Sequence, residues 1–158
     1  MATDRKELSD RIKQKLKVYY GKKKRAVFTE LGVCKKGRSR ADVFVLGFSG
    51  YMVIVEVKSS RADFMSDIKT GKWENYLPYC NQLYFAVPKK VYAKVKDDLP
   101  AGCGLFVIDT DDLRNKPKVA KKAKVRGIDP EVQANLVMRC AFRAADHTKY
   151  SKKRKADK

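Results

Sequence analysis

Two charged residues interrupt one of the most apolar stretches of the chain. Residues 51–60 read Tyr-Met-Val-Ile-Val-Glu-Val-Lys-Ser-Ser, so Glu56 and Lys58 stand two positions apart inside a predicted strand. Because a strand alternates its faces, both side chains point to the same face. A carboxylate and an ammonium group are costly to bury unless they are paired or bind a metal. These two residues are therefore the first candidates for a functional site.

The strand that contains them is predicted to be the third of a meander. Apolar, β-branched and aromatic residues recur in the segments 26–33, 41–47 and 51–60, and turn residues separate these segments. Gly50 can supply the positive φ that a three-residue hairpin loop needs before the third strand. The pattern predicts three consecutive antiparallel strands.

The lengths of the two loops predict which residues of the meander lie opposite one another. If the second loop is centred on Ser49, Asp42 lies directly opposite Glu56; if the first is centred on Lys36, Glu30 lies opposite Asp42. Directly opposed residues of antiparallel strands share a face. A slip of one residue in either loop would break this arrangement. The hypothesis is that three carboxylates and the lysine converge on one patch.

The rest of the pattern predicts an α/β sandwich. Its central mixed sheet is an antiparallel meander plus two further strands, and helices flank it. The remaining predicted elements are a helix at 4–20, a helix from an N-cap at Ser60 to Gly71, a helical stretch from Lys72, strands at 82–88 and 103–109, and a closing helix that starts at Asp129 and buries Val132, Leu136, Cys140 and Ala144.

The composition favours an anionic partner. The chain has 158 residues, enough for one domain, and 37 Lys and Arg against 18 Asp and Glu give a formal charge of +19. Such an excess favours nucleic acid, although a solubilising surface or an anionic membrane would also fit. No signal core or membrane-spanning run occurs, so we expect a soluble, cytoplasmic protein. Four widely spaced cysteines without a C-x-x-C pair predict free thiols.

Two basic segments stand outside the predicted elements. The run at about 114–128 has many Lys and Arg, and the pattern predicts either an exposed loop or an arm that orders on a polyanion. The composition of residues 149–158 predicts a disordered basic tail that follows a single domain at 1–148.

The spacing of the candidate residues suits phosphodiester hydrolysis. An acid on one strand followed by E-x-K on the next is the D…(D/E)-x-K pattern of metal-dependent nucleases. Asp42, Glu56 and the main-chain carbonyl of Val57 offer the oxygen ligands that Mg²⁺ or Mn²⁺ prefers. Lys58 can orient a water molecule or offset developing charge. The triplet alone is a weak signal in a basic protein, and its place on the central strand strengthens it.

A longer set of residues resembles a known family. The set comprises Arg40-Ala-Asp42, Val55-Glu-Val-Lys-Ser-Ser-Arg-Ala-Asp-Phe64, Asp67, Lys72-Trp73, Tyr76, Tyr79-Cys80 and Tyr84-Phe-Ala-Val-Pro88. It resembles the MmcB-like DNA-repair family of the PD-(D/E)XK nuclease superfamily. The resemblance implies a restriction-endonuclease-like sandwich, a divalent metal and a DNA substrate. It also implies a core site of Asp42, Glu56 and Lys58, with Glu30 as a fourth acidic position.

Other residues are predicted to contact nucleic acid: Arg40, Arg61, Lys69, Lys72, Trp73, Tyr76, Lys121, Lys122 and Lys124. Purely structural roles are alternatives for some of these residues: Glu56 and Lys58 can form a structural ion pair, and Trp73 can be a core residue. Asp67 is expected to be solvated.

The functional hypothesis is a metal-dependent DNA endonuclease that acts in DNA repair or processing. The alternative is a non-catalytic nucleic-acid-binding protein on a nuclease-like fold. The sequence does not distinguish DNA from RNA as the partner. It also leaves the oligomeric state open, with a homodimer as one alternative.

Overall fold

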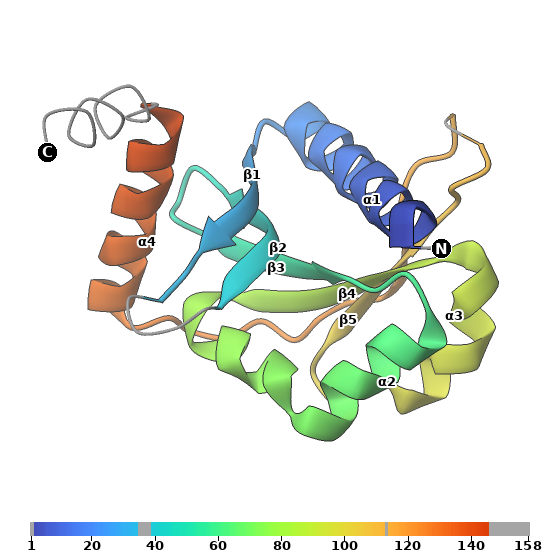
Figure 1. The fold of residues 1–158 in the computed structure, drawn as a ribbon. Helices are drawn as coiled ribbons and strands as arrows, with labels where there is room; N and C mark the ends of the chain where they lie inside the picture. The colour runs from blue at the N-terminus through green and yellow to red at the C-terminus, as the bar shows by residue number, and fades with distance from the viewer. Residues whose placement is uncertain (1, 35–38, 113, 146–158) are drawn as a thin grey trace, which may run out of the picture.

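One six-stranded mixed sheet forms the centre of the molecule, and its strands lie side by side in chain order. The computed structural model describes residues 2–34, 39–112 and 114–145 (Figure 1). The elements are α1 (Ala2–Lys22), β1 (Ala26–Gly32), β2 (Arg40–Leu46), β3 (Met52–Val57), α2 (Arg61–Thr70), the 3-10 helix η1 (Lys72–Tyr79), β4 (Gln82–Pro88), α3 (Lys89–Val95), the 3-10 turn η2 (Lys96–Asp98), β5 (Gly104–Ile108), β6 (Lys118–Lys121) and α4 (Pro130–Ala144).

The connections between strands confirm the predicted α/β class. Strands β1, β2 and β3 form the antiparallel meander, and β3, β4 and β5 are parallel. Parallel neighbours require crossover connections, which here run through α2 with η1 and through α3 with η2. The last strand, β6, returns antiparallel to β5.

Two hydrophobic layers enclose the sheet. On one face, Ile12, Leu16 and Tyr20 of α1 pack against alternate residues of the strands, among them Val43, Val53 and Val55. On the other face, Phe64, Tyr76 and Leu136 pack against Phe44, Ile54 and Phe85. Figure 1 shows α1 on one side of the sheet and α2 and α3 on the other. Every residue of β3 is buried, as expected for a central strand covered on both faces.

The segment predicted as an exposed loop or arm is exposed along β6, but β6 pairs with β5 as the sixth strand of the sheet, which the sequence pattern did not predict. Main-chain hydrogen bonds continue beyond β6, from Lys124 N to Gly102 O at 2.9 Å and from Arg126 N to Asn81 O at 2.8 Å. Ala123, directly before Lys124, is buried. The run of lysines does not show the usual pattern of a strand. Long charged side chains can stay in water while the main chain of the same residues forms hydrogen bonds with a neighbouring strand. The predicted tail at 149–158 lies outside the described residues.

Helix ends follow the predicted signals. Ser60 Oγ accepts a hydrogen bond from Asp63 N at 3.1 Å, and Gly71 ends α2 with a φ of 68°. Asp129 caps α4 by accepting from the first main-chain N–H groups of that helix. The predicted buried stripe of α4 is confirmed at Leu136 and Cys140, while Val132 is half-buried and Ala144 is exposed.

The described cysteines fit the expected chemistry of core thiols. Cys80, Cys103 and Cys140 are buried and form no disulfide. Burial raises the pKa of all three thiols, which keeps them in the unreactive protonated form. Among the described helices, none combines the length and the apolar character needed to cross a membrane.

Gly104 sits where β5 approaches its neighbours too closely for a side chain. A Cβ added there would lie 2.3 Å from the ring of Tyr84 and 2.8 Å from the main-chain nitrogen of Ala123. We expect Gly104→Ala to lower the Tm by roughly 5–10 °C, because overpacking strains the core. Thermal unfolding followed by circular dichroism measures this. Gly21→Ala is the control, because nothing lies within 4 Å of its added Cβ. Equal melting of Gly104→Ala and the unchanged protein would contradict the expected clash.

Candidate active site

The hairpin between β2 and β3 brings the two principal carboxylates face to face. Val43 pairs with Val55 and Leu46 with Met52, which is the predicted register. The same register, continued by one position, sets Asp42 opposite Glu56. The hairpin loop has the predicted form, with a φ of 77° at Gly50. The prediction that these two acids share a site is therefore supported by the geometry.

Each carboxylate is held by the main chain of the opposite strand. Asp42 N donates to Glu56 Oε1 at 3.2 Å, and Val57 N donates to Asp42 Oδ2 at 2.8 Å. These contacts fix both side chains at the end of the strand pair. The second oxygens, Asp42 Oδ1 and Glu56 Oε2, accept no hydrogen bond from the described residues.

The electrostatics of the pair reflect its burial. Glu56 is 4% exposed. Burial, together with the nearby charge of Asp42, raises the pKa of Glu56 to about 8. Burial also raises the pKa of Asp42, against the hydrogen bond from Val57 and the charges of Lys13 and Lys58, which lower it. Without a cation, a buried and a half-buried carboxylate that face each other favour holding a proton, and a bound cation would relieve their repulsion.

Lys58 is the first residue after β3, and its ammonium group points to a partner on α2. Lys58 N donates to Ala86 O at 2.9 Å, which continues the pairing of β3 with β4. Lys58 Nζ lies 2.9 Å from Asp67 Oδ2, and the two side chains are only 11% and 3% exposed. The expectation that Asp67 is solvated is wrong. Burial alone would lower the pKa of Lys58, but the adjacent carboxylate outweighs it and raises this pKa.

Glu30 lies near the site with its carboxylate engaged elsewhere. The pairs Thr29–Val43 and Leu31–Ala41 place Glu30 opposite Asp42, as predicted. Its side chain, however, forms ion pairs with Lys13 Nζ at 2.5 Å and with Arg40 Nε at 2.6 Å. These two cations outweigh partial burial and lower the pKa of Glu30.

The backbone at Glu30 explains this departure from simple alternation. Its φ of 57° is left-handed, which is uncommon for a residue other than glycine. Phe28 and Leu31 both contact the core layer of α2, although side chains three positions apart in a regular strand point to opposite faces. The distortion at Glu30 therefore breaks the two-residue period that the sequence prediction assumed.

The predicted nucleic-acid contacts separate into three groups. Exposed cations are Arg40, Arg61, Lys69, Lys72, Lys121, Lys122 and Lys124. Trp73 is half-buried and packs against the core, which is one of the two alternatives predicted for it. Tyr76 is 3% exposed and its hydroxyl donates to Arg40 O at 3.1 Å. This burial does not fit the predicted contact of Tyr76 with nucleic acid, because the residue supports the start of β2 from within the core.

The cations do not all gather at the carboxylates. Lys121 lies on β6, which is three strands away from β3 in the sheet. At about 4.8 Å between neighbouring strands, this separation is roughly 14 Å. Arg61 and Lys69 lie on α2, directly after the strand that carries Glu56. Any polyanion that touches both groups must extend across the sheet.

Two functional candidates escaped the sequence prediction. Lys13 belongs to α1, and nothing in its sequence neighbourhood distinguishes it from the other lysines of that helix. Asp67 had a usable signal, because it follows the apolar Phe64 at the three-residue spacing of one helix face, and both are buried.

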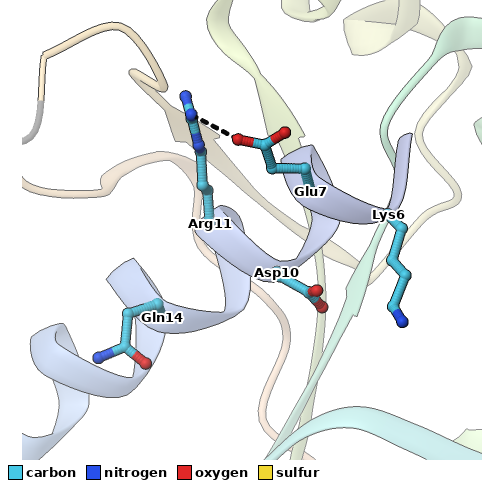
Figure 2. Close-up of a pocket in the computed structure, with 5 residues that line it drawn as sticks. All are labelled: Lys6, Glu7, Asp10, Arg11 and Gln14. Carbon is cyan, nitrogen blue, oxygen red and sulfur yellow. Dashed lines mark hydrogen bonds and ion pairs between the residues drawn. The ribbon is translucent and has the colours of Figure 1, made fainter. Parts of the chain in front are cut away.

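A shallow hollow on α1 offers a contrast with this site. Figure 2 shows that it is lined by Lys6, Glu7, Asp10, Arg11 and Gln14, all from successive turns of one helix. Arg11 and Glu7 neutralise each other in an ion pair of 2.7 Å. Exposed charges of both signs do not favour an anionic ligand there.

The residues present fit a hard divalent cation. Asp42 Oδ1 and Glu56 Oε2 are not used by other described groups, and carboxylate oxygens are suitable ligands. The predicted third ligand is the carbonyl of Val57, whose N–H already donates to Asp42. Within the ranges that the structure describes, no cluster of three Asp, Glu, His or Cys side chains forms a ready metal site. The cation would therefore depend on two carboxylates, a carbonyl and water.

Comparisons with known proteins agree with this architecture. The fold and the facing acids define an α/β domain whose polar site lies at the end of the central strand. The chain belongs to the family described as MmcB-like DNA repair proteins, whose profile matches residues 2–154. A search of curated proteins found no match.

One solved structure shares this fold, and two others show a weaker likeness. A protein of unknown function from Silicibacter pomeroyi is 26% identical, with a TM-score of 0.75 over 92% of this chain and 91% of that one. An fdxN element excision controlling factor protein from Anabaena variabilis is 21% identical, with a TM-score of 0.44 over 65% of this chain and 92% of that one. An XisH family protein from Nostoc punctiforme is 22% identical, with a TM-score of 0.41 over 64% and 92%. The last two likenesses are too low to bear on function.

Proposed function

We propose that this chain is a Mg²⁺- or Mn²⁺-dependent DNA endonuclease that acts in DNA repair. The observation that carries the proposal is the facing pair of Asp42 and Glu56, each anchored by the opposite strand, beside a buried lysine. Membership of a DNA repair family and a formal charge of +19 support DNA as the substrate.

The protein's own groups would divide the work. Asp42, Glu56 and the Val57 carbonyl would hold the cation, which when bound polarises the scissile phosphate and lowers the pKa of a water ligand. The Lys58 ammonium group would donate hydrogen bonds to the attacking water or to a phosphate oxygen as negative charge develops. Exposed cations such as Arg61 and Lys69 would contact backbone phosphates without reading bases.

A second candidate function is a DNA-binding module that does not cut. It is favoured by the engagement of Lys58 with Asp67, because a lysine committed to a structural ion pair would be lost to catalysis. Both functions predict salt-sensitive binding to DNA, so binding alone does not separate them.

Metal removal separates the two functions. We expect supercoiled, linear, nicked and single-stranded DNA to include at least one substrate that is cleaved with Mg²⁺ or Mn²⁺, and we expect EDTA to abolish the cleavage. Gel electrophoresis of end-labelled products measures this, and matched RNA substrates in the same panel test the other polymer. Restoration by excess Mn²⁺ after EDTA controls for damage to the protein. If no nucleic acid is cleaved under any condition while binding persists, the binding module is correct.

A further inference from the structure

We propose that Asp67 is the positioning residue for Lys58, and that it fixes the ammonium group on the side of β3 that carries Glu56. This inference rests on the proposed nuclease function and adds to it a residue from a different element. The contact between Lys58 Nζ and Asp67 Oδ2, at 2.9 Å, is its starting point.

Asp67 has little other reason to be buried. It is 4% exposed, and neither of its carboxylate oxygens has a well-formed hydrogen bond among the described residues. Burying a carboxylate without such bonds is costly, and an opposite charge in contact offsets part of the cost. The ion pair with Lys58 is the favourable contact that this carboxylate makes.

The packing of α2 on the sheet places Asp67. Phe64, one turn earlier on α2, is fully buried and packs edge-on against Phe85 of β4, with ring centroids 5.1 Å apart. Phe64 and Asp67 thus share the helix face that meets the sheet. The helix begins at the Ser60 cap, only two residues after Lys58, so strand end and helix start are closely coupled.

The pair restricts a side chain that is otherwise mobile. A lysine ammonium group carries three N–H donors on a flexible four-carbon stem. Asp67 pairs with one N–H group of the Lys58 ammonium and leaves the other two N–H groups for a water molecule or a phosphate oxygen. Anchoring reduces the conformational freedom that would be lost on reaching the transition state.

The test compares Asp67→Asn, Asp67→Glu and the unchanged protein. We expect Asp67→Asn to lower kcat about 10- to 100-fold while KM and DNA affinity stay unchanged, because the lysine loses its anchor but remains present. Asp67→Glu should restore part of kcat, because it keeps the charge. Single-turnover cleavage and fluorescence anisotropy with labelled DNA supply these values.

Asp63→Asn is the matched control. It removes the same charge one turn earlier on the same helix, from an exposed side chain that contacts the backbone at Ser59 instead of Lys58. We expect its kcat to stay within about threefold of the unchanged protein. Equal losses in both variants, or a change in KM alone, would overturn the positioning role. A rise in kcat for Asp67→Asn would also overturn it, because Asp67 would then withhold Lys58 from the substrate.

Thermal unfolding keeps the inference testable if the unchanged protein cleaves nothing. In that case the proposed function fails, and a cycle of Lys58→Met, Asp67→Asn and the double variant still reports on the pair. We expect each single change to lower the Tm by about 10 °C, since it strands a buried charge. The double variant should melt above the less stable single one, because it leaves no buried charge without a partner. Additive losses would overturn the pairing itself.

Discussion

Asp42→Asn and Glu56→Gln are each expected to reduce metal-dependent DNA cleavage by about a thousand-fold or more, on the order of 4 kcal/mol of transition-state stabilisation. Each change keeps the shape of the side chain and removes the charge that holds the cation. DNA affinity should be unchanged or slightly higher, because a negative charge near the phosphates is lost. Initial rates with saturating Mn²⁺ and anisotropy titrations measure the two effects.

The control for these variants is Glu7→Gln. Glu7 is an exposed acid on α1 whose partner is Arg11 of the same helix (Figure 2). Its loss removes the same charge away from the carboxylate pair, so cleavage should remain at the level of the unchanged protein. Cleavage that persists in both Asp42→Asn and Glu56→Gln would show that hydrolysis occurs at another site.

Glu56→Gln should also stabilise the protein above neutral pH, although the same change removes activity. Burial and the charge of Asp42 raise the folded-state pKa of Glu56 from 4.5 to about 8. Between these two pH values the folded state therefore binds more protons than the unfolded state. Stability contributed by this group is full below the unfolded pKa and is lost as pH rises through the folded pKa.

The expected difference in unfolding free energy has a definite pH window. Glu56→Gln and the unchanged protein should differ little at pH 4, then diverge up to about pH 8, where the variant is more stable by about 5 kcal/mol at most. Urea unfolding at a series of pH values measures this. A flat difference across the window would mean that Glu56 is not strained by its surroundings.

Two further measurements extend the pH experiment. Glu30→Gln should have the opposite sign, because the ion pairs of Glu30 with Lys13 and Arg40 lower its pKa and stabilise the fold at neutral pH. Saturating Mn²⁺ at pH 8 should raise the Tm of the unchanged protein but not that of Glu56→Gln. The second of these reports cation binding without any measurement of cleavage.

The sequence predicted the parts of the site that depend on loop length and strand alternation over a few residues. The hairpin has a tight loop with Gly50 at its end, so counting residues back from the turn sufficed to face Asp42 with Glu56. The helix signals at Ser60 and Asp129 were equally local. Loop chemistry and strand alternation act over a few residues, and one sequence contains all that they need.

The parts that escaped depend on contacts between distant segments. The left-handed backbone at Glu30 could not be predicted, because the residue is not a glycine. Its ion-pair partner Lys13 comes from another element, α1. The burial of Asp67 follows from how α2 lies on the sheet. Strand β6 has no apolar alternation of its own, and it forms because β5 offers an unpaired edge. Tertiary packing decides each of these, and local propensity does not report it.

The edge position of β6 has a consequence for the colloidal behaviour of the protein. A free sheet edge is a template for strand addition by another chain, and lysines along such an edge oppose this by charge repulsion. Lys118 and Lys121 are exposed on β6, in a chain with a formal charge of +19. When a polyanion neutralises these charges, the repulsion between neighbouring copies falls. We therefore expect the protein to be less soluble when bound along nucleic acid than when free, and we expect high salt to weaken the same protection by screening.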